Sequence, residues 1–362
     1  MSSSPTLVFV HGSWHQPSCY SKITKILQER HGLKCVAPAL PSTSGNPDAT
    51  FKDDIDVVRE AISREVSAGT DVVVIAHSYG GMVGNSAIKG FVRPRNEQSA
   101  AAQGTSGSII GLILIASGFT ITGLAFMDPF FGRPPPQWRI NRETGYAEIV
   151  ISPREFFYHD LPDDEANYWV SQLTTQSLKS LFEGGEFAYA GWMDVPSFYI
   201  GTVEDHGLPV AMQRLGVGVA RELGAHVEHR ELRTSHSPFL SQPEETTEII
   251  WEAVQAFTGR PIDRARTGTG RNHQILIPAV RVSQPLTWYR YGLPLAFGHF
   301  FGRCFKIFNG RDADERDGTW FAMKLKDTRL LSYWHAGLQT ISDCGIFGVL
   351  AFMFPKWANL KA

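Results

Sequence analysis

Short apolar runs alternate with amphipathic stretches along the first 118 residues of the chain and again after residue 195. Unbroken runs such as Val72 to Ala76 and Ile109 to Ala116 are typical of parallel strands buried on both faces. Apolar positions three and four residues apart between Asp48 and Ser67 predict a helix. Strands that alternate with helices in this way predict an α/β fold with a doubly wound, mostly parallel sheet.

The same pattern gives bounds for each expected element. The expected strands are 6–10, 34–40, 72–76, 109–116, 197–202 and 227–232. The expected helices are 18–30, 48–67, 82–92, 209–223 and 243–257.

Two segments depart from the alternation. Residues 119–194 contain a proline-rich turn, a hairpin signal at Glu143 to Gly145 and helix-like stretches. We interpret them as a largely helical cap. The cap is inserted into a core of residues 1–118 and 195–260. Residues 261–362 begin as a glycine and arginine linker and continue as an aromatic-rich C-terminal extension, to which the sequence assigns no role.

The composition argues against several classes of protein. The chain of 362 residues has 34 basic and 36 acidic residues and no long basic block, which argues against binding to nucleic acid. Its four cysteines are scattered, which favours neither a disulfide scaffold nor a zinc site. With no secretory leader and no long apolar run, we expect a cytoplasmic protein. For the extension, interfacial membrane association near residues 345–354 and packing against the protein body are alternative interpretations.

The chemistry concentrates where the run from Val72 to Ala76 passes into His77-Ser78-Tyr79-Gly80-Gly81 and then into a helix. A serine at such a tight strand-to-helix turn is typical of a nucleophile elbow. The residues two before and two after the serine must be small for strand and helix to pack, and Ala76 and Gly80 meet this condition. Ser78 is the expected nucleophile.

A serine hydroxyl needs a general base and a group that orients the base. Asp205 follows the expected strand 197–202, and His236 follows the expected strand 227–232. The order serine, acid, histidine along the chain matches the hydrolase arrangement. Glu204 is the alternative acid.

Ester hydrolysis also needs N–H donors aimed at the developing oxyanion. We expect one from the backbone of Tyr79 and a second from Ser13, within His11-Gly12-Ser13-Trp14 after the first strand. The reaction expected from these residues requires no metal and no organic cofactor.

These motifs, together with Leu208-Pro209 and Ser235 to Pro243, resemble the α/β-hydrolase superfamily over about Thr6 to Thr258. The similarity is to the branch that includes plant methylesterases, plant hydroxynitrile lyases and small fungal and bacterial esterases. The stretch Phe156-Phe157-Tyr158-His159-Asp160-Leu161-Pro162 resembles the fungal members in particular. The resemblance implies a serine hydrolase acting through an acyl-enzyme.

The resemblance also bears on the choice between ester hydrolysis and cyanohydrin cleavage. The lyases carry lysine after the catalytic histidine and threonine after the first strand's histidine, where this chain has Ser237 and Gly12. Both departures favour a small carboxylic ester as the substrate, in catabolism or in secondary metabolism. Carbon–carbon cleavage and a receptor-like protein that binds a ligand without turnover are the alternatives. We expect aromatic residues to line the substrate pocket, namely Trp14, Phe130, Phe157 and Trp169.

Overall fold

A six-stranded, entirely parallel sheet forms the centre of the computed structural model, which describes residues 4–93, 107–130, 132–259 and 275–278. The strand order is β2-β1-β3-β4-β7-β8. The strands are β1 (Thr6–Val10), β2 (Cys35–Val36), β3 (Val72–His77), β4 (Ile109–Ile115), β7 (Ser197–Thr202) and β8 (Val227–Leu232). The order reverses direction after β2, as expected for a doubly wound sheet.

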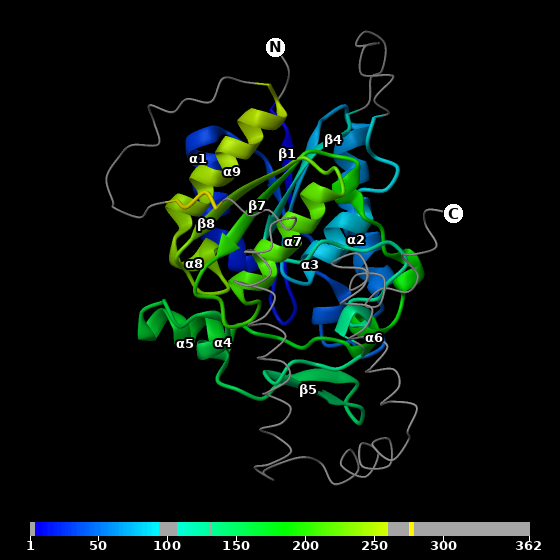
Figure 1. Ribbon diagram of the computed structural model, residues 1–362, viewed down its shortest axis with the longest axis vertical. Coiled ribbons are helices and arrows are strands. Elements are labelled where there is room, and N and C mark those ends of the chain that lie inside the picture. Colours follow the sequence, from blue (N-terminus) through cyan, green and yellow to red (C-terminus); the bar gives the residue numbers. More distant parts are fainter. Residues whose placement is uncertain (1–3, 94–106, 131, 260–274, 279–362) are drawn as a thin grey trace, which may run out of the picture. The chain divides into compact units, whose positions relative to one another are not determined.

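Helices cover both faces of this sheet (Figure 1). The helices α1 and α9 pack together on one face, while α2 and α3 pack together on the other, which α7 also covers. Their bounds are α1 (Ser21–His31), α2 (Phe51–Ser67), α3 (Gly80–Ala87), α7 (Val210–Glu222), α8 (Pro238–Ser241) and α9 (Pro243–Phe257). Because both faces are covered, every residue of β1, β3 and β7 is buried.

Two of the expected elements end several residues before the predicted position, and the helices expected from residues 18 and 48 begin at Ser21 and Phe51. The expected strand 34–40 is wrong beyond β2, because Pro38 has no N–H with which to continue the ladder. The expected helix 82–92 is wrong at its C-terminal end, since α3 ends at Ala87 and Gly90 adopts a positive φ of 83°. The strands β7 and β8 and the helix α9 have the predicted bounds.

Residues 119–194 mix strand and helix. The strands β5 (Trp138–Asn141) and β6 (Tyr146–Ile149) form an antiparallel hairpin at the predicted turn. The helices are α4 (Pro153–Phe157), α5 (Asp163–Ser171) and α6 (Leu178–Phe182), with short 3-10 turns between other segments. We refer to residues 119–194 as the cap.

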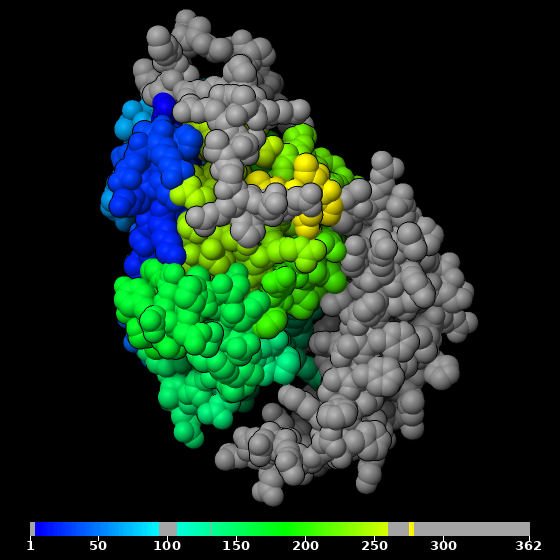
Figure 2. Space-filling view, turned by 90° about the vertical axis from the view of Figure 1, so that its left-hand side faces the viewer, coloured from blue at the N-terminus to red at the C-terminus, as the bar shows by residue number. Residues whose placement is uncertain are grey.

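Most of the C-terminal extension, residues 261–362, lies outside the described residues. Within residues 275–278, Leu276 and Glu231 of the edge strand β8 exchange two backbone hydrogen bonds of 2.8 and 3.0 Å. In Figure 2 these residues (yellow) lie on the surface formed by the C-terminal part of the core (yellow-green). In the part of the chain that the structure describes, no helix is both long and apolar enough to cross a membrane.

A substitution where α3 approaches β1 tests this packing. A Cβ at Gly80 would overlap the backbone carbonyl oxygens of Val10 and His11. We therefore expect Gly80→Ala to lower the free energy of unfolding by about 2 kcal/mol, because neither carbonyl can move without disturbing the sheet. Chemical denaturation measures the change. Gly118→Ala is the matched control, since a Cβ there meets no atom within 4 Å, and an equal effect of both variants would contradict the packing argument.

Candidate active site

The turn between β3 and α3 holds Ser78 in a strained conformation. Ser78 has a φ of 52°, in the left-handed region that non-glycine residues rarely adopt. Its N–H donates to the carbonyl of Ile115 on β4 at 3.1 Å, and its carbonyl accepts from the hydroxyl of Ser117 at 2.6 Å. The neighbouring strand therefore holds the backbone that carries the hydroxyl, and the side chain is half-buried at the carboxyl edge of the sheet.

His236 and Asp205 are brought together from the ends of β8 and β7. The Nδ1–H of His236 donates to Oδ2 of Asp205 at 2.7 Å, and both side chains are buried. By contrast, Glu204 is exposed, and its carboxylate lies 4.0 Å from the guanidinium of Arg233. Asp205 is thus the acid that contacts the imidazole.

Four further donors orient the Asp205 carboxylate. The N–H groups of Gly207 and Leu208 donate to Oδ1 at 2.7 and 2.8 Å. The Thr202 hydroxyl and the Gln213 amide donate to Oδ2 at 2.7 and 3.2 Å. With both oxygens occupied, the carboxylate has one orientation, and so does the ring that donates to it.

The turn after β1 lies directly against Ser78. A Cβ built at Gly12 would lie 2.9 Å from Cβ of Ser78, so only glycine allows this approach. The N–H of His15 donates to the carbonyl of Gly12 at 3.3 Å, which closes a turn in which Trp14 has a φ of 60°. Ser13 therefore lies within a tight turn whose first residue, Gly12, packs against Ser78.

Tyr79, the residue after the serine, is anchored by a buried carboxylate. Its hydroxyl donates to Oδ2 of Asp54 at 2.7 Å, and the N–H of Ser42 donates to Oδ1 at 2.9 Å. Burial raises the pKa of Asp54 from 3.8 to about 6, against the opposing effect of these hydrogen bonds. The network continues into the cap, because Gln176 donates to the hydroxyls of Ser42 and Ser180 at 3.2 and 2.6 Å.

The expected pocket residues lie in three different surroundings. The rings of Trp14 and Phe157 have centroids 6.1 Å apart, and Phe157 lies 5.8 Å from the imidazole of His236. Trp169 is on α5, where its indole N–H donates to Glu165 at 3.2 Å, and Phe130 ends a half-buried 3-10 turn. Phe157 thus lies beside the histidine and Trp14 lies beside Phe157.

Comparison with known proteins places this geometry in a family. The model of the family described as "Alpha/beta hydrolase family" matches residues 7–249. The chain belongs to the alpha/beta hydrolase family. Relatives include the alpha/beta hydrolase nvfD of Aspergillus novofumigatus, which is 25% identical over 256 residues, or 69% of this chain and 96% of the relative. The pyrethroid hydrolase of Sphingobium wenxiniae is 25% identical over 285 residues, or 73% of this chain and 91% of the relative.

Solved structures of this family share the fold. A pyrethroid hydrolase from Sphingobium faniae superposes with a TM-score of 0.53 at 20% identity, over 70% of this chain and 98% of the other. Polyneuridine aldehyde esterase superposes with a TM-score of 0.53 at 19% identity, over 69% of this chain and 98% of the other. The protein therefore has the alpha/beta hydrolase fold. Its relatives are named as hydrolases and esterases.

Sequence reasoning missed several residues of this hydrolase site. Trp138 and Phe156 were evident as cap aromatics but were not among the four expected pocket residues, and they complete the ring cluster with centroids 6.1 and 6.2 Å from that of Trp14. Gln213 supports Asp205, and the only signal for it was a polar residue on the buried side of an amphipathic helix. His77 donates to the carbonyl of His236 at 2.9 Å, and burial lowers its pKa, so the ring is a neutral support beneath the histidine.

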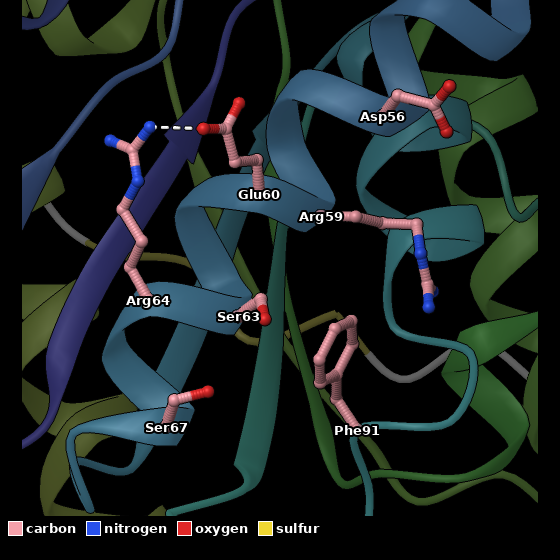
Figure 3. A pocket seen from close by; sticks show the side chains of 7 residues that line it. All are labelled: Asp56, Arg59, Glu60, Ser63, Arg64, Ser67 and Phe91. Atoms are coloured by element: carbon pink, nitrogen blue, oxygen red, sulfur yellow. Dashed lines mark hydrogen bonds and ion pairs between the residues drawn. The ribbon is translucent and has the colours of Figure 1, made fainter.

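A separate hollow of about 600 Å³ lies along the outer face of α2 (Figure 3). Its aromatic wall is Phe91, over which the guanidinium of Arg59 lies 4.6 Å from the ring centroid. Arg64 pairs with Glu60 at its edge. None of its seven lining residues belongs to the site around Ser78, and the hollow carries no part of the chemistry described above.

Asp54 makes the stability of the protein depend on pH. Its pKa is raised in the folded state, so between about pH 4 and pH 6 the folded protein keeps a proton that the unfolded chain releases. The contribution of Asp54 to the free energy of unfolding is therefore highest at low pH and falls as the pH rises from about 4 to about 6. A difference of about two pKa units corresponds to about 3 kcal/mol.

We expect the free energy of unfolding of wild type, relative to Asp54→Asn, to fall by about 2 kcal/mol between pH 4 and pH 7, the remainder of the effect lying below pH 4. Denaturant titrations at several pH values measure this difference. Asp53→Asn is the control, because hydrogen bonds from Thr50 lower the pKa of Asp53 from 3.8, so its contribution is lost only at lower pH and stays nearly constant between pH 4 and pH 7. A pH-independent difference for Asp54→Asn would contradict the argument.

Proposed function

We propose that the protein is a serine hydrolase that cleaves carboxylic esters through an acyl-enzyme at Ser78. The observation that carries the proposal is that His77, which directly precedes the strained Ser78, contacts His236 of the buried His236–Asp205 pair, with ring centroids 4.6 Å apart and a 2.9 Å hydrogen bond to the His236 carbonyl. Carboxyl ends of parallel strands meet at one edge, which is where this fold places its reacting groups.

In the proposed reaction, Nε2 of His236 takes the hydroxyl proton of Ser78 while Oγ attacks the ester carbonyl. The carbonyl oxygen becomes an oxyanion that accepts from the N–H groups of Ser13 and Tyr79. Collapse expels the alcohol, which receives the proton from His236. Water then attacks the acyl-enzyme with His236 again as base, and the acid and free serine are released. Asp205 stabilises the charged imidazole in both steps.

The ring cluster supports an apolar or aromatic group on the acyl or alcohol side. Trp14, Trp138, Phe156 and Phe157 have neighbouring centroids between 4.2 and 6.2 Å apart, and Phe157 adjoins His236. Aromatic rings next to a reactive centre favour flat apolar ligands. The names of two relatives, a pyrethroid hydrolase and a polyneuridine aldehyde esterase, are consistent with ester cleavage.

Ser78→Ala tests the nucleophile. Release of p-nitrophenol from short-chain and aromatic p-nitrophenyl esters should fall by about 10⁴-fold or more, because no other group forms the acyl-enzyme. Labelling by a fluorophosphonate should be lost together with turnover. A folded wild type that neither turns over nor becomes labelled would refute the proposal and favour a protein that binds its ligand unchanged.

Asp205→Asn and Glu204→Gln form a matched pair that tests the acid. Asp205→Asn should lower kcat by about 10³-fold or more, because an amide N–H facing Nδ1 disfavours the tautomer that His236 needs. Glu204→Gln should leave kcat within about twofold of wild type, since surface ion pairs contribute little. The same steady-state assay measures both variants, and comparable losses in the two would show that Asp205 is not the orienting acid.

A further inference from the structure

The turn that carries Ser13 contains an energetically unfavourable backbone conformation. Trp14 has a φ of 60°, and a bulky residue in the left-handed region costs on the order of 1 kcal/mol or more. Such a conformation persists only where surrounding contacts fix it. In this protein three separate segments of the cap supply those contacts.

The first contact runs through His15. Its Nδ1–H donates to the carbonyl of Ser13 at 2.8 Å, so Nε2 carries the lone pair that accepts from the hydroxyl of Tyr158 at 2.9 Å. Burial lowers the pKa of His15 to about 3, which keeps the ring in this neutral form. Tyr158, at the C-terminal end of α4, is itself buried. One chain of hydrogen bonds therefore joins the cap to the backbone carbonyl of Ser13.

The second and third contacts hold Trp14. The N–H and hydroxyl of Thr174, which follows α5, both donate to the Trp14 carbonyl, at 2.8 and 3.2 Å. The Trp14 indole N–H donates to the carbonyl of Ala147 on β6 at 2.9 Å. Thus the carbonyl and the side chain of the strained residue are both bonded to the cap.

The same stretch of cap reaches the loop that carries the catalytic base. The carboxylate of Asp160 accepts from the N–H of Ser235 at 2.9 Å, and the carbonyl of Phe157 accepts from the Ser235 hydroxyl at 2.7 Å. Ser235 directly precedes His236. Residues 157–160 therefore connect the turn after β1 with the histidine loop.

We propose that Tyr158 and His15 are positioning residues that align the Ser13 N–H with the oxyanion. The inference rests on the proposed ester hydrolysis. Neither residue reacts, since both ring nitrogens of His15 already form hydrogen bonds and the Tyr158 hydroxyl donates to Nε2. Their effect falls on the transition state, because the oxyanion forms only there.

Tyr158→Phe separates this role from packing. The phenyl ring keeps its edge contact with His15, whose centroid is 5.9 Å away, and only the hydroxyl is lost. We expect kcat for p-nitrophenyl esters to fall at least about tenfold, with KM within about twofold, because ground-state binding does not use the oxyanion donors. Tyr168→Phe, also in the cap but 55% exposed, is the control and should match wild type.

A transition-state analogue gives a readout that structural damage alone would not produce. An aryl boronic acid forms a tetrahedral adduct with the serine, so its affinity for Tyr158→Phe should fall by the same factor as kcat/KM. His15→Asn retains an N–H donor near the Nδ1 position, whereas His15→Gln places its donor near Nε2. We expect His15→Asn to keep at least about tenfold more activity than His15→Gln.

Suppose that folded Tyr158→Phe has the same kcat/KM and the same affinity for the boronic acid as wild type. That result would overturn the inference and leave the proposed hydrolysis intact. If Tyr158→Phe does not fold, the two His15 variants decide, and equal loss in both would overturn it. An inactive wild type refutes the proposed function, and the inference with it.

Discussion

The close approach of the elbow between β3 and α3 to the end of β1 is the constraint on which the site depends. Gly80 has no room for a side chain beside the β1 carbonyls, and Gly12 has none beside Ser78. Because these backbones touch, the turn after β1 can present its N–H groups at the carbon that Ser78 would attack. The cost is a pair of left-handed residues, Ser78 and Trp14, which other parts of the protein must hold in place.

The cap supplies much of that support through buried polar bonds. It reaches Trp14 and His15 on one side of the elbow, and through Gln176 it joins the network of Asp54 and Tyr79 on the other. Buried polar groups are expensive when unpaired, so a displaced cap would leave several of them unsatisfied at once. The cap is therefore part of the architecture that holds the turn after β1 and the loop before His236.

The fold was predictable because its signals are local. Unbroken apolar runs predicted β3 and β4, and the elbow sequence around Ser78 predicted which strand end carries the chemistry. The contact between His15 and Tyr158 joins residues 143 positions apart, and no periodicity reports such a pair. The cap aromatics illustrate the same limit. Composition predicted a ring-lined pocket, but only the hairpin's path brings Trp138 to Trp14.

The most direct test is a crystal structure of the protein after reaction with an aryl fluorophosphonate, whose phosphonyl oxygen mimics the oxyanion. The account predicts a covalent bond to Oγ of Ser78 and a phosphonyl oxygen about 2.7 to 3.1 Å from the backbone nitrogens of Ser13 and Tyr79. It also predicts that the bond between Tyr158 and His15 persists in the adduct. An adduct on another residue, or a phosphonyl oxygen turned away from the Ser13 peptide, would contradict the account.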